Sequence, residues 1–165
     1  MSKKFIFIIF ILLGCAIFVG GQTLPIKIKN YLDKTYAGWK LTSIADGCYS
    51  EFANSVIAGD FNGDKKRDYA VKFIKGRKGY ILAFLERKTS YANHILESMS
   101  ATEVKNTGLS IAKRGEEYPI GGEYPDYKLG RLKNDAPLIG TCESHAYHYV
   151  YRNGNLIEIS TVKND

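Results

Sequence analysis

Two runs of residues that favour strands, joined by Asn153-Gly154, constrain the fold of this chain most strongly. The run Glu143–Arg152 precedes the dipeptide and Asn155–Thr161 follows it. Asn-Gly between alternating strands is the strongest short-range signal for a β-hairpin, because both residues readily adopt positive φ. The C-terminal part of the chain is therefore expected to form an antiparallel hairpin.

Further strands are expected along the middle of the chain. Tyr69–Ile74 and Tyr80–Leu85 are rich in aromatic and β-branched residues, and the segment 75–79 between them contains two glycines. Tyr91–Met99 indicates another strand, and Trp39–Ile44 alternates as a half-buried strand does. Residues 100–140 are rich in Gly, Pro, Lys and Asp, which predicts loops with short strands around Leu109 and Leu129.

One helix is expected before these strands. Thr23 precedes Pro25 as a candidate N-cap, and apolar residues then recur at helical spacing from Ile26 to Tyr36 until Gly38 ends the segment. The polar face of this helix is mixed in charge, so we expect it to cover a sheet and not to lie on a membrane. The predicted fold class is α+β, with the N-terminal helix packed on a mainly antiparallel β-sheet.

The N-terminus has the pattern of a secretory signal peptide. Lys3 and Lys4 precede an apolar run that ends near Val19, about 15 residues and shorter than the ~20 that a transmembrane helix needs. Val19 and Gly21 fit the −3 and −1 positions of a cleavage site. We therefore expect residues 1–21 to be a signal peptide and 22–165 to be a single secreted or periplasmic domain.

A second processing route is open at Cys15. The tetrad Leu12-Leu13-Gly14-Cys15 resembles the lipobox of bacterial lipoproteins, in which the cysteine is acylated, although hydrophobic residues still follow it here. The alternative is thus a membrane-anchored lipoprotein with its lipid on Cys15. In an oxidising compartment the two remaining cysteines, Cys48 and Cys142, are expected to form a disulfide, the alternative being two separate buried thiols.

Composition narrows the function classes. Hydrophobic residues make up 45% of the chain and charged residues 24%, as in an ordinary globular protein. The formal net charge is +6, but Lys3 and Lys4 contribute two of these charges and the others are spread along the chain. We therefore expect no nucleic-acid partner. The sequence contains no enzyme signature.

One segment has the spacing of a metal-binding loop. Asp60, Asn62, Asp64 and Asp68 occupy positions 1, 3, 5 and 9 of a tight loop, and the Lys66 carbonyl stands at position 7. Ca²⁺ takes 6–8 oxygen ligands, which alternate residues of a curled loop can direct at one centre. These five residues are the candidate ligands of one Ca²⁺ ion.

The segment around this loop, residues 57–86, resembles the calcium loops of FG-GAP and VCBS-type repeats. The resemblance implies an EF-hand-like loop placed between β-strands, and it implies one module, not a propeller. The sequence departs from the family pattern at Lys65, where the family has a glycine with positive φ, and at Val71, where an EF-hand has a bidentate Glu.

The basic residues of this loop lower the expected affinity. Lys65, Lys66 and Arg67 lie beside the three carboxylates and partly cancel the field that attracts a dication, so a weak, structural site is expected. The alternative is a loop without metal, in which the Asp and Asn side chains cap their own backbone as Asx-turns.

The remaining candidates for chemistry lie in the C-terminal hairpin. His145 and His148 are three residues apart on a strand and face opposite ways, which excludes a shared metal. Glu143 and His145 share a face and suggest a hydrolase, but no nucleophile elbow accompanies them. Tyr147, Tyr149 and Tyr151 form a ladder that either binds sugar rings or peptide, or packs on a neighbouring layer.

The sequence thus predicts an exported calcium-binding interaction module, without enzymatic activity, whose partner is an unknown macromolecule or glycan. The alternatives are a metal-free secreted inhibitor or surface adhesin and, third, a hydrolase that uses Glu143 and His145. An exposed tyrosine-rich face favours a binding module, whereas a deep cleft around Glu143 and His145 favours catalysis.

Overall fold

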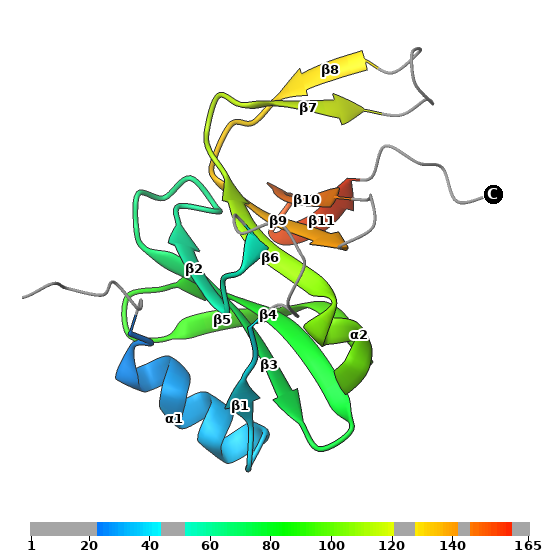
Figure 1. Cartoon of the computed structure of the whole chain (residues 1–165). Helices are drawn as coiled ribbons and strands as arrows, with labels where there is room; N and C mark the ends of the chain where they lie inside the picture. Colours follow the sequence, from blue (N-terminus) through cyan, green and yellow to red (C-terminus); the bar gives the residue numbers. More distant parts are fainter. Residues whose placement is uncertain (1–22, 44–51, 121–127, 142–145, 160–165) are drawn as a thin grey trace, which may run out of the picture.

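A computed structural model of the chain describes residues 23–43, 52–120, 128–141 and 146–159 (Figure 1). Its elements in chain order are α1 (Ile26–Thr35), β1 (Lys40–Leu41), β2 (Val56–Gly59), β3 (Asp68–Lys75), β4 (Lys78–Glu86), β5 (Tyr91–Ser100), α2 (Ala101–Lys105), β6 (Thr107–Ala112), β7 (Glu117–Ile120), β8 (Lys128–Arg131), β9 (Ala136–Thr141), β10 (Ala146–Arg152) and β11 (Asn155–Ile159). The named strands all pair antiparallel, so the described part of the protein is mainly antiparallel β.

The first sheet has the order β1-β3-β4-β5, and β2 also pairs with β3. The second sheet has the order β11-β10-β9-β6, and β7 and β8 form a separate two-stranded hairpin that projects from the body of the molecule (Figure 1). Side chains from both sheets meet in one buried cluster, to which Phe61, Ala70 and Ile81 contribute from the first half of the chain and Leu109 and Ile139 from the second. The two sheets therefore face each other across a shared core.

A second buried cluster includes residues of α1 and of the first sheet. Ile28 and Leu32 are fully buried in a cluster with Val71 and Phe73 of β3, because residues four apart lie on one side of a helix. The helix begins and ends where expected, to within one residue, but its N-cap residue differs from the prediction. Pro25 occupies the N-cap position, where it makes no side-chain cap hydrogen bond, so the prediction that Thr23 caps the helix is wrong.

Both predicted hairpins are confirmed as β3–β4 and β10–β11, and Tyr91–Met99 is confirmed as β5. The β3–β4 turn is shorter than predicted, since Lys75 pairs directly with Lys78. The strand predicted over residues 39–44 is also shorter, because only Lys40 and Leu41 pair with β3.

The interpretation of residues 100–140 missed three elements, namely α2, β7 and β9, whereas the short strands expected around Leu109 and Leu129 are β6 and β8. Helix α2 begins at a capping box in which the Ser100 side chain accepts from the Glu103 N–H and the Glu103 carboxylate accepts from the Ser100 N–H. Strand β9 lies in the middle of the second sheet, between β6 and β10. This region is thus more regular than its composition suggests.

An irregularity marks the edge strand β5. Ile81 pairs with Glu97 and Leu82 with Ile95, so Leu96 is an extra residue that forms a β-bulge. The Leu96 carbonyl accepts a hydrogen bond from the Tyr149 hydroxyl of the second sheet at 3.1 Å. The bulge therefore takes part in joining the two sheets.

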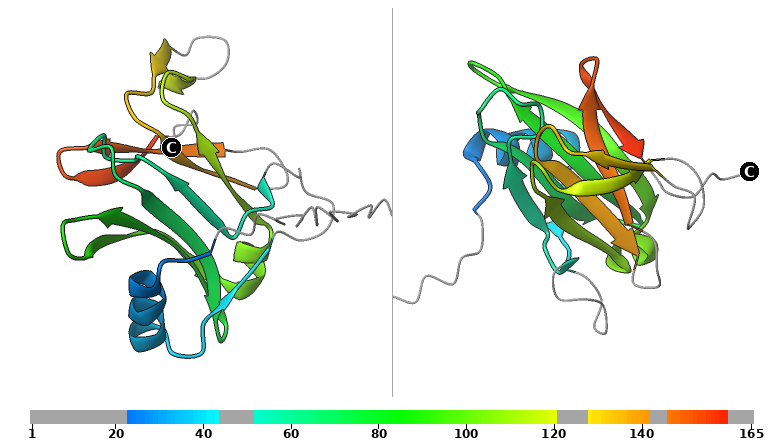
Figure 2. Two further views of the ribbon diagram at one scale, coloured as in Figure 1. Left: turned by 90° about the vertical axis from the view of Figure 1, so that its left-hand side faces the viewer. Right: turned by 90° about the horizontal axis from the view of Figure 1, so that it is seen from above.

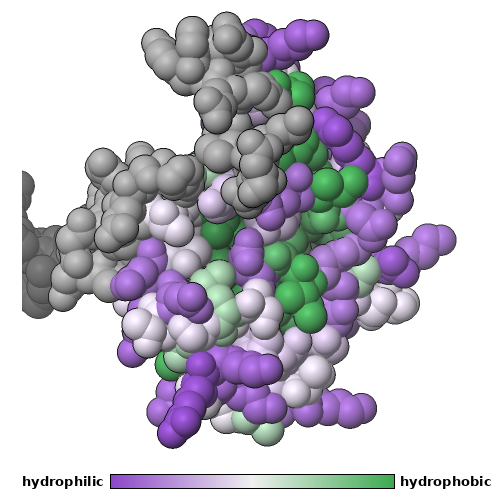
Figure 3. All heavy atoms as spheres, turned by 90° about the vertical axis from the view of Figure 1, so that its right-hand side faces the viewer, coloured by the Kyte–Doolittle hydropathy of each residue, from purple (hydrophilic) through white to green (hydrophobic). Residues whose placement is uncertain are grey.

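Apolar surface remains open to solvent in this fold. Figure 3 shows hydrophobic side chains in a band bordered by hydrophilic ones on one face of the molecule. The most exposed large hydrophobic residues of the described chain are Ile26, Ile95 and Leu129, which are 59–66% exposed. Within the described ranges, no helix is both long and apolar enough to span a membrane.

Candidate functional site

The candidate calcium loop connects β2 to β3. Three turns lie at the same end of the molecule, namely this loop, the β4–β5 turn and the tip of the β10–β11 hairpin (Figure 2, left). Asn62, Arg87 and Gly154, one from each turn, line a common pocket. Strand β3 begins at Asp68, as the resemblance to calcium loops between strands implies.

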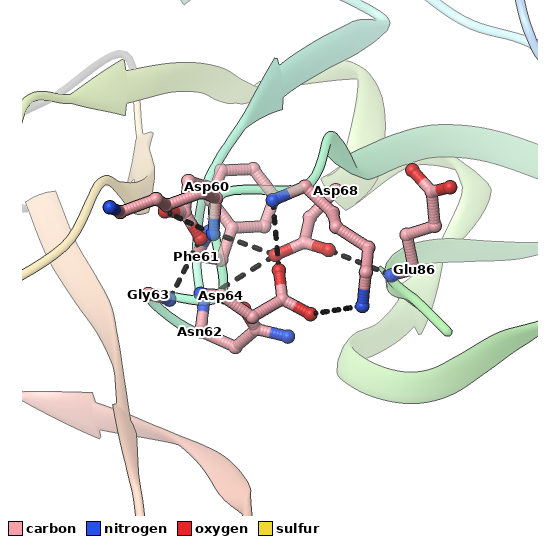
Figure 4. A network of polar contacts seen from close by, with 9 residues as sticks. Asp60, Phe61, Asn62, Gly63, Asp64, Asp68 and Glu86 are labelled. Carbon is pink, nitrogen blue, oxygen red and sulfur yellow. Dashed lines mark hydrogen bonds and ion pairs between the residues drawn. The ribbon is translucent and has the colours of Figure 1, made fainter. Parts of the chain in front are cut away.

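Side-chain oxygens inside the loop accept hydrogen bonds from its own backbone (Figure 4). The two Asp60 carboxylate oxygens accept from the N–H groups of Gly63 and Lys65 at 2.8 and 3.0 Å. Asn62 accepts from the Asp64 N–H, and Asp64 accepts from the Lys66 N–H, each at 2.9 Å. The Asn62 and Asp64 contacts, each with the residue two positions on, are the Asx-turns expected of the alternative without metal. Together with the Asp60 contacts they also fix the curl that a cation site needs.

Asp68 differs from the other acidic residues of the loop because it is fully buried. Its Oδ2 accepts from the N–H groups of Phe61 and Asn62 at 2.9 and 3.3 Å, and its Oδ1 accepts from the Glu86 N–H at 2.7 Å. Burial raises the pKa of the Asp68 carboxyl to about 6, although the three N–H groups favour the charged form. Asp68 thereby ties the loop to the end of β4.

The backbone has the conformation that the sequence pattern requires at Lys65, with φ of 64° at this residue and 80° at Gly63. Positive φ is unfavourable for a residue with a Cβ atom, so the loop keeps its curl in spite of the lysine. The Asp60 contact with the Lys65 N–H stabilises this conformation locally.

Basic side chains lie close to the acidic side chains of the loop, as their neighbouring positions in the sequence suggest. The Lys66 ammonium lies 2.9 Å from Asp64 Oδ2, and this hydrogen bond is the largest cause that lowers the pKa of Asp64. The Arg67 guanidinium lies over the Tyr69 ring at 5.7 Å. A cation in the loop would therefore compete with Lys66 for the Asp64 carboxylate.

The donor set fits a hard cation in its chemistry, since it consists of carboxylate, amide and carbonyl oxygens. Each carboxylate oxygen of Asp60 accepts one hydrogen bond and keeps a lone pair for another interaction. The described residues contain no group of three or more His, Cys, Asp or Glu side chains that is arranged to hold a metal ion. Asp60, Asn62, Asp64, the Lys66 carbonyl and Asp68 remain the residues that would hold Ca²⁺.

The loop is also held by a residue that sequence reasoning missed. Asp135, which follows β8, accepts from the Asp60 N–H at 3.3 Å and from the Arg114 N–H at 3.1 Å, and its own N–H donates to the Asp60 carbonyl at 3.1 Å. Asn134-Asp135 is a turn signal in the sequence, but nothing in its spacing indicates a contact 75 residues away.

The tyrosine ladder belongs to the core. Tyr149 is 4% exposed, and Tyr147 and Tyr151 are partly buried against the same cluster between the sheets. The ladder therefore packs on a neighbouring layer and does not form an exposed tyrosine-rich face. His148 contacts the Tyr118 ring, with 5.7 Å between the ring centroids.

Several sequence candidates lie outside the described residues. These are Glu143 and His145, the three cysteines Cys15, Cys48 and Cys142, and the signal segment 1–21.

Comparison with protein-family models finds no match for the chain. Comparisons with curated proteins and with solved structures find none either. The relation to FG-GAP and VCBS-type loops therefore rests on residues 57–86 alone.

Proposed function

We propose that this protein is a small exported interaction module whose 60–68 loop binds one Ca²⁺ ion weakly, in a structural role. The observation that carries the proposal is the curl of the loop. Positive φ at Lys65 accompanies oxygen donors at alternate positions, of which Asp60, Asn62 and Asp64 turn their side chains back into the loop. Ca²⁺ bound there would hold the β2–β3 connection rigid, and no chemical step is assigned to it.

The apolar surface supports the interaction role. Ile95 and Leu129, which are 61% and 59% exposed, leave hydrophobic area available for a partner. In this proposal α1 stays packed on the first sheet, because Ile28 and Leu32 are buried there. A metal-free inhibitor or adhesin is the alternative, and the calcium experiment separates it from the proposal.

The test is thermal unfolding and calorimetric titration of residues 22–165 with Ca²⁺ and, separately, Mg²⁺. If the dissociation constant is about 10⁻⁴ M, then Ca²⁺ at about 1 mM stabilises the fold by about 1.4 kcal/mol, or roughly 2–5 °C. Mg²⁺ should have a much smaller effect, because it demands a smaller octahedral cage and releases its waters reluctantly.

Matched variants locate the site. Asp60→Ala should abolish the calcium-dependent shift, whereas Asp33→Ala, which removes an exposed carboxylate in α1, should retain it. Absence of both a calcium heat and a melting shift in the native protein would leave the Asx-turn loop and reject the metal.

Export and processing form a separate part of the proposal. Mass spectrometry of protein recovered from its native host should find Gln22 as the first residue, or an acylated Cys15 if the lipobox is used. The proposed Cys48–Cys142 disulfide should lower the non-reduced mass by about 2 Da relative to the reduced mass. An intact Met1 in the cytoplasm would contradict export.

A further inference from the structure

A basic cleft lies between the β8–β9 turn and the end of the β10–β11 hairpin, beside the base of the β7–β8 hairpin. It has a volume of about 440 Å³, and Arg131, Lys133 and Arg152 line it together with the rings of Tyr118 and Tyr151. None of these residues belongs to the 60–68 loop. The cleft is therefore a second candidate site.

The charge of the cleft is positive. Asp135 is the carboxylate among its lining residues, and it is already engaged with the Asp60 and Arg114 N–H groups and with the Lys113 ammonium at 3.5 Å. Within the described ranges, neither Lys133 nor Arg152 forms an ion pair. Two cations thus face the cleft without a carboxylate partner of their own.

Arg152 is held in place by a buried residue. Its guanidinium donates to the Tyr118 hydroxyl at 3.3 Å, and Tyr118 is only 6% exposed. Arg131 is less free to bind a ligand, because it forms an exposed ion pair with Glu117 at 2.8 Å. The Tyr118 contact thus restrains the Arg152 guanidinium before any ligand arrives, which lowers the entropy lost on binding.

The walls and floor of the cleft add two further kinds of contact. The side-chain amides of Asn134 and Asn153 line it and have no hydrogen-bond partner in the described part of the chain. Leu132, Ala136 and Val150 are buried beneath the cleft, and the half-buried Tyr151 ring supplies its apolar surface. The cleft therefore offers cations, free amides and apolar surface within one volume.

We propose that this cleft binds an acidic saccharide, with Lys133 and Arg152 on the carboxylate of a uronic acid residue. The Asn134 and Asn153 amides pair with sugar hydroxyls, and the Tyr151 ring packs against the C–H face of the sugar ring. A bare inorganic anion uses only the cations, whereas an acidic sugar uses all three kinds of contact. The inference deepens the proposed function, because it names the class of partner of the interaction module.

The experiment is isothermal titration of residues 22–165 with a short oligogalacturonide and with a neutral oligosaccharide of the same length. The uronate is expected to bind and the neutral sugar to bind at least about tenfold more weakly, because it lacks the charge-assisted hydrogen bonds. Lys133→Gln/Arg152→Gln should weaken uronate binding by about tenfold or more. Arg152→Lys should weaken it less, since the charge is kept and the guanidinium fork is lost.

A control variant distinguishes binding in the cleft from non-specific electrostatic attraction to the whole protein. Lys34→Gln/Lys40→Gln removes the same charge from exposed positions in α1 and β1, and should change the affinity less than about twofold. Equal losses in the two double variants, binding of the neutral sugar as tight as that of the uronate, or inorganic phosphate that binds as tightly as the uronate would each overturn the proposal. So would the absence of uronate binding.

The calcium-dependent melting shift of the same samples tests the 60–68 loop independently. A preserved shift without uronate binding rejects the saccharide alone, and uronate binding without a calcium shift rejects the metal alone. The melting temperature of each variant without ligand verifies that it is folded.

Discussion

Two fully buried ionisable side chains lie four residues apart on β3, and the protein satisfies them very differently. The Asp68 carboxylate accepts three backbone hydrogen bonds, whereas the Lys72 ammonium donates a hydrogen bond to the Thr107 carbonyl at 2.7 Å. Asp68 and Lys72 are each two residues from Ala70 along the strand and therefore lie on the same face as Ala70, which is in the core between the sheets. The difference teaches that position in a strand decides burial, whereas neighbouring loops decide whether a buried charge is compensated.

The pKa values of the two groups express this difference. Burial raises the pKa of Asp68 to about 6, against the effect of its three N–H partners, and burial alone lowers the pKa of Lys72 from 10.5 to about 8. Asp68 accepts from N–H groups in the β2–β3 loop and at the end of β4. Without the Asp68 carboxylate, these N–H groups have no acceptor. Lys72 donates to one carbonyl group and remains a desolvated cation at neutral pH.

The largest effect is expected for Asp68→Ala. Three backbone N–H groups lose their acceptor at a buried position, so the free energy of unfolding should fall by roughly 3–5 kcal/mol. Urea unfolding with excess chelator measures this loss apart from any cation. Asp64→Ala, in the exposed part of the same loop, is the control and should lose about 1 kcal/mol or less. Equal losses for the two variants would contradict the role assigned to Asp68.

Lys72→Met should act in the opposite direction. A pKa shift from 10.5 to about 8 corresponds to about 3 kcal/mol at most, so the variant should gain about 1–3 kcal/mol of unfolding free energy at neutral pH. The unfolded chain binds more protons than the folded chain between these two pKa values. The stability contribution of the native lysine therefore rises as pH increases from 8 to 10.5.

Urea unfolding at several pH values tests this second prediction. The gain from Lys72→Met should shrink above pH 8, whereas the exposed control Lys78→Met should show no such trend. A lysine-to-methionine change that destabilises the protein at every pH would show that the Thr107 contact outweighs desolvation.

Tyr149→Phe extends the comparison to a buried group without charge. The Tyr149 hydroxyl lies 2.6 Å from Glu97 Oε1 and 3.1 Å from the Leu96 carbonyl, and therefore joins the second sheet to β5. Its removal should lower the free energy of unfolding by about 1–2 kcal/mol, which chemical denaturation can measure. Tyr151→Phe in the same strand is the matched control, and a loss of similar size there would argue against a special role for the inter-sheet contact.

The smallest expected effect concerns backbone conformation in the loop. Lys65→Gly should raise the free energy of unfolding by about 0.5–1 kcal/mol, because φ is 64° at this position. Gly63→Ala should do the reverse, since a Cβ atom there would lie 2.6 Å from Asn134 Oδ1 and φ is 80°. Thermal unfolding in chelator compares the pair, and a neutral or stabilising Gly63→Ala would disprove the strain argument.

Local features of the fold were predictable from the sequence where one short segment carries the whole signal. The Asn153-Gly154 turn fixes the register of β10 and β11, with Arg152 opposite Asn155, and two glycines mark the β3–β4 connection. The capping box at Ser100 and Glu103 is an equally local signal. It was missed because it follows directly on β5 and begins a segment whose composition predicts loops.

Features that depend on distant pairing were not predictable in this way. Strand β9 contains Pro137 and Gly140, which weaken its strand signal, and it is stabilised between β6 and β10 by pairing across the second sheet. The same limit applies to the candidate site. The spacing of Asp68 predicts a cation ligand, but its contact with the Glu86 N–H and its full burial arise only when β3 and β4 are paired.

The bulge at Leu96 affects how readily another chain can pair with the edge of the first sheet. Strand β5 is ten residues long and forms one edge of the first sheet, and such an edge is a template for strand addition and aggregation. An extra residue at Leu96 interrupts the regular spacing of this edge, and its carbonyl is turned to the Tyr149 hydroxyl. An incoming strand thus finds a discontinuous edge, so the bulge that helps to join the two sheets also makes strand addition at β5 less favourable.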